Sequence, residues 1–185
     1  MCTEAEVQRL LPLVSEQRRE QALRYKHTLG RFCCLKSWLI WRELSGEGLP
    51  VTGDGLWTYN EHGKPYIEGG PYFSLSHCKA GIAVAVDDKP IGIDMENIRH
   101  ADDALIARTM NTDEQLQIAQ ADDRDRAFTR LWTQKEAVVK MQGTGIESFE
   151  QLQNILSNPT AYDCTGIRIK TVEENEYIYS IAYKY

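Results

Sequence analysis

Three short apolar runs near the middle of the chain constrain its fold most strongly. Residues 72–76, 80–86 and 91–96 are rich in β-branched and aromatic side chains and are bounded by turn residues, so each run is predicted to be a strand. Residues 87–89 are short enough for a tight turn, and Pro90 opens the third run. We therefore expect the second and third strands to pair as an antiparallel hairpin.

A helical pattern precedes these strands. Residues 15–44 carry an apolar stripe that Ser15 can cap and that Gly46 can end, so one long helix is predicted there. Residues 49–70 follow and are rich in glycine and turn residues, so loops and one short strand are expected.

The second half of the chain is predicted to hold three helices followed by two strands. The first helix is expected at residues 102–110, and the second begins at Thr112, with Gln115 completing a capping box. The third runs from about Asp123 or Asp125 to Met141, before Gly143. The two strands are expected at residues 166–172 and 177–183. The order helix, strands, helices, strands predicts an α+β fold. The best internal division lies near Pro90, which gives halves 1–90 and 91–185.

Composition argues against two classes of protein. The 185 residues are 42% apolar, enough to bury a core, and the net charge is −6. Nucleic-acid binding depends on neutralising phosphates, and an acidic chain is poorly suited to it. No run of about 18 uncharged apolar residues predicts a membrane span. Residues 18–42 nevertheless hold seven Lys or Arg against one acid, so a local site for a small polyanion is possible.

The cysteines indicate a reducing compartment. There are five, an odd number, and no pair has Cys-x-x-Cys spacing, so we predict reduced thiols in a cytoplasmic protein. The first residues lack a basic region ahead of an apolar one, and no export signal is expected.

Two acidic residues share one face of the third strand. In PIGIDMENI, Asp94 and Glu96 alternate with the apolar Ile91, Ile93 and Met95. Neighbouring carboxylates repel unless a proton or cation lies between them, and a hard divalent ion such as Mg²⁺ prefers oxygen ligands. A strand with one solvated face would show the same pattern, so this pair alone is weak support for a metal site.

A helix in the second half adds two charged residues. In RLWTQKEAVVKMQGTG, Glu136 and Lys140 are four apart and lie on one helix face. The simpler interpretation is a surface salt bridge worth about 0.3–0.5 kcal/mol. The functional interpretation is that Glu136 joins Asp94 and Glu96 at one site.

A third motif ends the first predicted strand. In YFSLSHCKAG, Ser76 and His77 precede a turn and could hold a phosphate or a ribose. The pair could also be a nucleophile and its base, but no Gly-x-Ser-x-Gly elbow surrounds either serine.

Taken in order, the motifs GKPY, FSLSH, GIDMEN and LWTQKEAVVKMQGTG resemble those of the 4′-phosphopantetheinyl transferases of the pseudo-dimeric, surfactin-synthetase-activating type. The resemblance spans residues 15–146. It implies two similar α+β halves with the active site in the cleft between them, which suits a division near Pro90. It also implies transfer of the 4′-phosphopantetheine group of coenzyme A to a serine of an apo acyl or peptidyl carrier protein, with release of adenosine 3′,5′-bisphosphate.

The resemblance assigns a role to each charged residue. Asp94, Glu96 and Glu136 would coordinate Mg²⁺ together with the coenzyme A pyrophosphate. From the chemistry of the transfer, Glu136 would accept the serine proton directly or through a metal-bound water. Lys140 would stabilise or protonate the departing oxygen.

By the same resemblance, four residues would bind coenzyme A around its adenosine and 3′-phosphate: Arg18, Lys64, Ser76 and His77. Gln21 stands where the family often has a basic residue, so that site would be weaker or would borrow Arg24 or Lys26. Lys135 would contact the pantetheine side or solvent.

The carrier protein would dock on segments that flank the cleft, for which residues 49–60 and 101–111 are the candidates. A chain that holds both halves of its cleft is expected to act as a monomer. Two alternatives remain from the residues alone: a non-catalytic module that binds coenzyme A or a nucleotide, and a metal-dependent phosphohydrolase.

Overall fold

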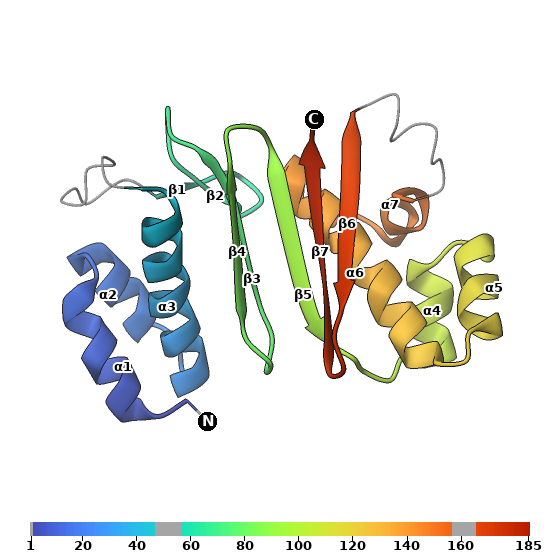
Figure 1. Ribbon diagram of the computed structural model, residues 1–185, viewed down its shortest axis with the longest axis horizontal. Coiled ribbons are helices and arrows are strands. Elements are labelled where there is room, and N and C mark those ends of the chain that lie inside the picture. The colour runs from blue at the N-terminus through green and yellow to red at the C-terminus, as the bar shows by residue number, and fades with distance from the viewer. Residues whose placement is uncertain (1, 47–56, 157–165) are drawn as a thin grey trace.

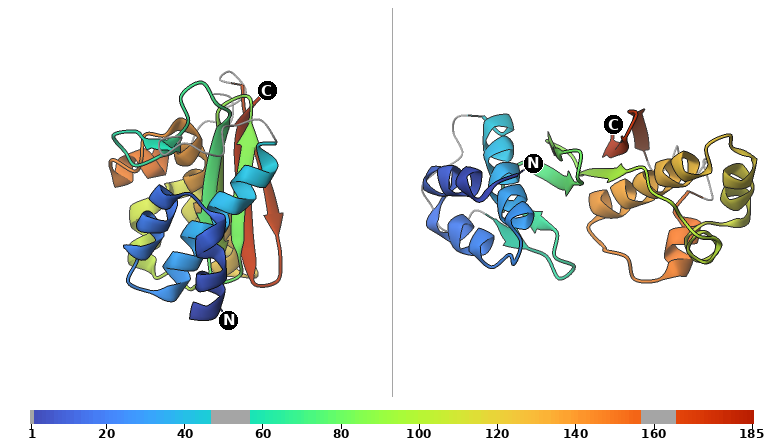
Figure 2. Two further views of the ribbon diagram at one scale, coloured as in Figure 1. Left: turned by 90° about the vertical axis from the view of Figure 1, so that its left-hand side faces the viewer. Right: turned by 90° about the horizontal axis from the view of Figure 1, so that it is seen from below.

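The computed structural model describes residues 2–46, 57–156 and 166–185 and has an α+β fold (Figure 1). Two groups of helices lie at opposite ends of the molecule, and the strands lie between them; the view from below in Figure 2 shows the same order. Within the described residues, no helix is long and apolar enough to cross a membrane. Most of the predicted docking segment 49–60 and Cys164 fall outside the described residues.

The N-terminal helices differ from the prediction of one long helix. They are α1 (Glu4–Leu10), a short 3₁₀ turn (Leu11–Leu13), α2 (Glu16–Leu23) and α3 (Thr28–Leu44). The predicted cap is confirmed, since the Ser15 hydroxyl accepts a hydrogen bond from the Arg18 N–H. The chain then breaks between α2 and α3, and His27, in extended conformation, precedes the new helix. The break lets α2 fold back on α3, so that Ala22 and Leu35 are buried in the same core.

The strands form three small sheets. β1 (Thr58–Tyr59) pairs with β2 (Pro65–Tyr66), and β3 (Tyr72–His77) pairs with β4 (Ile82–Asp87). The third sheet has the order β5-β7-β6, made by β5 (Ile91–Asn97), β6 (Ile167–Glu173) and β7 (Tyr177–Lys184), all antiparallel.

All five strands predicted in these regions are confirmed, but the predicted hairpin is wrong. Among the described strands β4 pairs with β3, and β5 pairs with β7 at the far end of the sequence. The Cys78 N–H donates to the Gly81 carbonyl at 3.0 Å and closes the β3–β4 turn instead. Local patterns identify strands, but they carry no information on a partner some eighty residues away.

β3 and β5 lie side by side without a backbone ladder between them (Figure 1). Two serine hydroxyls bridge them: Ser74 Oγ accepts from the Ile93 N–H at 3.0 Å, and Ser76 Oγ accepts from the Met95 N–H at 3.1 Å. Because residues two apart on a strand share one face, both hydroxyls meet the same edge of β5. This junction places Ser76 next to Asp94.

The helices of the second half are α4 (Asp103–Thr109), α5 (Thr112–Gln120), α6 (Arg124–Gln142) and α7 (Phe149–Asn154). The first three confirm the prediction, whereas α7 was not predicted. The capping box is shifted by one residue, since Asn111 and Glu114 form it rather than Thr112 and Gln115. Gly143 ends α6 with a positive φ of 75°.

α6 lies directly on β5 and β7. A Cβ atom at Gly92 would lie 2.0 Å from the Ala137 carbonyl oxygen and 2.3 Å from the Met141 nitrogen, so only glycine allows this approach. The close contact brings the polar face of β5 under the helix that carries Glu136 and Lys140.

Candidate active site

The predicted acidic residues meet at the contact between β5 and α6. Asp94 is 3% exposed, and its Oδ1 accepts from the Lys140 ammonium at 2.6 Å and from the Ser76 hydroxyl at 3.0 Å. The Lys140 ammonium also donates to Ser76 Oγ at 3.1 Å. A strand and a helix from the second half and a strand from the first half therefore share one polar cluster.

Glu96 and Glu136 lie within the electrostatic field of the same cluster. Burial, reinforced by the negative charge of Asp94, raises the pKa of Glu136, and Lys140 only partly offsets this. Burial and Asp94 likewise raise the pKa of Glu96, against the opposing charges of Arg99 and Lys140. Three carboxylates thus share the opposing charges of Lys140 and Arg99, so additional positive charge would stabilise their ionised forms.

The cluster has donor atoms that suit a hard divalent cation. Asp94 Oδ2 is buried and accepts no hydrogen bond from the described residues, while its other oxygen is occupied. As the side chains lie, no three Asp, Glu, His or Cys residues in the described part of the chain are close enough to hold one ion. Asp94, Glu96 and Glu136 fit such an ion by chemistry, and they would have to approach one another to bind it.

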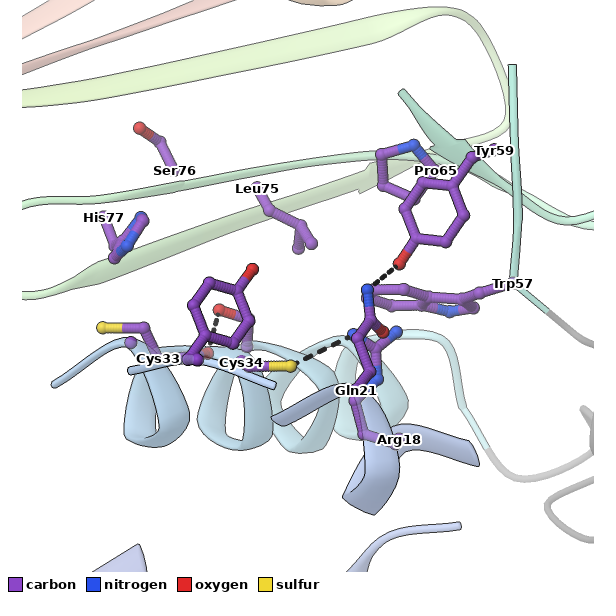
Figure 3. A pocket seen from close by; sticks show the side chains of 13 residues that line it. Arg18, Gln21, Cys33, Cys34, Trp57, Tyr59, Pro65, Leu75, Ser76 and His77 are labelled. Atoms are coloured by element: carbon purple, nitrogen blue, oxygen red, sulfur yellow. Dashed lines mark hydrogen bonds between the residues drawn. The ribbon is translucent and has the colours of Figure 1, made fainter. Parts of the chain in front are cut away.

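A cavity of about 230 Å³ opens beside this cluster, between α2, α3, β3 and residues 57–65 (Figure 3). The Arg18 guanidinium points into it and lies 3.8 Å from the centroid of the Trp57 ring. Its Nη1 lies 3.6 Å from Cys34 Sγ, a weak acceptor. Among the described residues no carboxylate forms an ion pair with Arg18, so the pocket has a net positive charge.

Three of the four residues predicted to bind coenzyme A line this pocket: Arg18, Ser76 and His77. The Ser76 hydroxyl points away from α3 (Figure 3), and its three hydrogen bonds to Asp94, Lys140 and Met95 use its full capacity. Burial and the nearby Lys140 charge lower the pKa of His77 below 6.5, so its imidazole is neutral at pH 7. The pocket and the acidic cluster therefore meet at these two adjacent residues.

The fourth, Lys64, does not line this pocket. Its ammonium donates to the carbonyl of Met141 at 3.1 Å and to that of Ile91 at 3.4 Å, and burial lowers its pKa to about 8. Lys64 therefore ties the end of α6 to the start of β5, while the next residue, Pro65, forms part of the pocket wall.

The structure also locates the residues predicted around the missing basic position. Gln21 lines the pocket, and its Nε2 donates to the Tyr59 hydroxyl at 2.6 Å. Arg24 and Lys26 are exposed and do not line the cavity. Arg18 is thus the cation that the described residues place in this pocket.

Sequence reasoning missed several residues of the site. The aromatic walls formed by Tyr25, Trp57 and Tyr59 were not predicted, nor was the position of Arg99 beside the carboxylates. A tryptophan within a polar, glycine-rich stretch is the one signal that would have pointed to the pocket, because such stretches rarely need a large apolar ring.

Both predicted environments for Lys135 are wrong. Its side chain is 0% exposed, and its ammonium donates to Glu114 and to two backbone carbonyls. These bonds use all three ammonium hydrogens, and none is left for pantetheine or water.

Fold and site together define an α+β protein in which an acidic cluster adjoins a basic, aromatic pocket suited to a phosphorylated ligand. The model of one protein family, the 4′-phosphopantetheinyl transferase superfamily, matches residues 90–181. Over 143 residues the chain is 32% identical to the 4′-phosphopantetheinyl transferase AcpT of Salmonella typhimurium strain LT2. This alignment covers 74% of this chain and 72% of that protein. The chain belongs to the 4′-phosphopantetheinyl transferase superfamily.

Two Bacillus relatives are similar over a comparable region. The chain is 33% identical over 146 residues to the 4′-phosphopantetheinyl transferase psf-1 of Bacillus pumilus, and 31% identical over 146 residues to a 4′-phosphopantetheinyl transferase of Bacillus subtilis. The alignments cover 76% of this chain but only 63% and 65% of those proteins. The chain therefore spans less than two thirds of the length of these relatives.

Proposed function

We propose that the protein transfers the 4′-phosphopantetheine group of coenzyme A to a serine of an apo acyl or peptidyl carrier protein and releases adenosine 3′,5′-bisphosphate. One observation carries the proposal: Lys140 bonds Asp94 and Ser76 at the edge of the pocket that Arg18 and His77 line. Groups that can neutralise phosphate and groups that can move a proton are therefore adjacent. A module that only binds its ligand has no need of a partly buried Glu136.

The chemistry is one displacement at phosphorus. The serine oxygen of the carrier forms a bond to the β-phosphorus, and the bond from that phosphorus to the bridging pyrophosphate oxygen breaks. Glu136 accepts the serine proton, and its raised pKa makes it a stronger base than an ordinary glutamate. Lys140 stabilises or protonates the departing oxygen, where negative charge develops.

Asp94, Glu96 and Glu136 would hold Mg²⁺. When bound, the ion would neutralise the pyrophosphate, which is the main requirement of phosphoryl transfer. The free Oδ2 of Asp94 and the mutual repulsion of the three carboxylates support this assignment.

The pocket would hold the adenosine and 3′-phosphate end of coenzyme A. Stacking on Trp57 uses one face of the Arg18 guanidinium, and Nη1 lies 3.6 Å from Cys34 Sγ, so a phosphate would meet the remaining N–H groups of its edge. Trp57 is buried and already stacked by Arg18, whereas Tyr59 is 46% exposed and offers a ring surface for the base. For Lys64 we propose a supporting role, in which its bonds to α6 and β5 keep Pro65 in the pocket wall.

We further propose that residues 1–90 and 91–185 form two similar halves with the active site between them. The junction of β3 and β5 supports this, because Ser76 comes from one half and Asp94 from the other. Since one chain supplies both sides, the protein would act as a monomer, in the cytoplasm, without nucleic acid or membrane as partner.

For carrier docking we propose residues 101–111, which comprise α4 and the residues just before and after it. Residues 98–100 connect this segment to the end of β5, the strand that carries Glu96. Arg108 within it and Arg99 just before it would pair with acidic groups of the carrier, while Asp102 and Asp103 bring negative charge to the start of the segment.

The test is to incubate the protein with coenzyme A, Mg²⁺ and an apo acyl carrier protein, and to measure the carrier's mass. We expect a gain of one phosphopantetheine that disappears when Mg²⁺ is removed with EDTA. Binding of coenzyme A without mass gain by several carriers would favour the binding module. Coenzyme A cleavage without a carrier would favour the phosphohydrolase.

Arg18→Ala should raise the KM for coenzyme A by about tenfold, since a charge-assisted bond to a phosphate is worth about 1.5–3 kcal/mol. The KM for 3′-dephospho-coenzyme A should change much less, because that substrate lacks the group that Arg18 would bind. The matched control is Arg19→Ala, which removes an exposed arginine one position along the same helix. Equal effects of Arg18→Ala on both substrates would remove Arg18 from the 3′-phosphate site.

A further inference from the structure

A buried lysine that the proposed mechanism does not use joins four helices at one point. The Lys135 ammonium on α6 lies 2.6 Å from the Leu152 carbonyl oxygen of α7, 2.7 Å from Glu114 Oε2 of α5 and 3.1 Å from the Thr109 carbonyl oxygen of α4. Thr109 is the last residue of α4, so its carbonyl has no partner within the helix. The Leu152 carbonyl also accepts from the Ile155 N–H at 3.4 Å, so there the ammonium adds a second and shorter bond. One side chain thus fixes α6 to three neighbours.

Glu114 extends this contact into the connection between α4 and α5. The oxygen that meets Lys135 also accepts from the Asn111 N–H at 2.8 Å, and Asn111 Oδ1 accepts from the Glu114 N–H at 2.9 Å. Thr109 is the last residue of α4, and Asn111 is the N-cap of α5. Lys135 therefore holds both ends of this connection, which we call the α4–α5 joint (residues 109–114).

The same turn of α6 faces the active site on its other side. Successive residues of a helix are about 100° apart, so Lys135 and Glu136 point in different directions. Lys135 meets the α4–α5 joint, whereas Glu136 and Lys140 lie with the carboxylates of β5. If the α4–α5 joint shifts relative to α6, the distance between the joint and the reacting groups Glu136 and Lys140 therefore changes.

We propose that Lys135 is a positioning residue that holds α4 and the α4–α5 joint, where the carrier protein would dock, at a fixed place relative to Glu136. The inference rests on the proposed function. Loss of Lys135 frees the docking segment to move, so the carrier serine is presented less often. The groups around coenzyme A come from α2, α3, β3 and residues 57–65 and are unaffected.

Stability alone does not require a lysine at this position. The cost of removing two charges from water offsets most of the gain from a buried ion pair, and apolar replacements of such pairs are often neutral. What an apolar side chain cannot do is bond the Thr109 and Leu152 carbonyls and Glu114 at once. The contribution of Lys135 to stability and its role in positioning the α4–α5 joint can therefore be separated by experiment.

The test compares Lys135→Met with the double variant Lys135→Met, Glu114→Gln. Lys135→Met should lower the Tm, because Glu114 stays buried without its partner, and kcat/KM for an apo acyl carrier protein should fall at least about tenfold through misplacement. In the double variant, glutamine removes the buried charge yet can still accept from the Asn111 N–H. The Tm should therefore recover in part, because the Thr109 and Leu152 carbonyls still lack the ammonium, while kcat/KM for the carrier stays low. The dissociation constant of coenzyme A, measured by calorimetry, should stay within about twofold in both.

Arg130→Met is the matched control. It removes a positive charge and an ion pair to Glu173 from the same helix, on a side chain that is 40% exposed. Carrier kinetics should not change. Recovery of kcat/KM together with Tm in the double variant would overturn the inference, as would failure of both variants to fold, which would make Lys135 a folding determinant. A wild-type protein that binds coenzyme A but modifies no carrier would instead refute the proposed function and the inference with it.

Discussion

Glu136→Gln is expected to lower kcat for phosphopantetheine transfer by at least about 10²-fold, the usual size of a general-base contribution. Glutamine keeps the shape of the side chain but cannot accept the serine proton. Steady-state kinetics with coenzyme A and an apo acyl carrier protein measure this directly. The fold should be intact, since Glu136 is destabilised rather than stabilised as an anion by burial and by Asp94.

The same variant carries a pH signature. Because the pKa of Glu136 in the folded protein lies above its usual 4.5, the folded state holds this proton more tightly than the unfolded chain. The contribution of this bound proton to the free energy of unfolding is fully present below pH 4.5. It is lost as the pH rises through the raised pKa of Glu136. Glutamine does not ionise, so the variant does not lose this stability. The Tm of the variant minus the Tm of the wild type should therefore increase as the pH rises to 7.

The control for both effects is Glu150→Gln, which alters an exposed glutamate on α7. It should leave kcat and the pH dependence of Tm unchanged. Full activity of Glu136→Gln would remove Glu136 from the role of base, and a Tm difference that shrinks with rising pH would contradict the electrostatics of the cluster.

Lys140→Ala is expected to lower kcat by about 10²-fold or more while changing the KM for coenzyme A by less than about threefold. The ammonium would meet charge that develops on the departing oxygen only as the bond breaks, so its loss acts mainly on turnover. Initial rates over a range of coenzyme A concentrations separate the two constants. Lys170→Ala, an exposed lysine on β6, is the control. A variant whose KM rises while kcat holds would make Lys140 a binding residue.

Much of the acidic cluster was predictable because its geometry is local on each element. Alternation along β5 puts Asp94 and Glu96 on one face, and a spacing of four on α6 does the same for Glu136 and Lys140. The structure confirms that the two faces meet. Gly92 carried the missing information, since a glycine in the strand indicates that another backbone approaches it closely.

The pairing of the strands and the environment of Lys135 were not predictable in this way. β5 finds its partner β7 across most of the second half of the chain, and no local pattern encodes that contact. Lys135 looks like a surface residue because lysine usually is one. Its burial depends on α7, an element that the sequence did not predict, and on a glutamate that already caps another helix.

The junction of β3 and β5 is held differently from the strands within each sheet. Among the described strands, hydroxyl groups rather than a row of peptide bonds cross this line. A single neutral hydrogen bond such as that from the Ile93 N–H to Ser74 Oγ is worth about 1 kcal/mol, whereas a backbone ladder opens only by losing many bonds together. Under the proposed function, the line at which coenzyme A and the carrier would meet is thus a line that side chains hold and that no ladder crosses among the described strands. Separation along it would leave the hydrogen-bond ladder of each sheet intact.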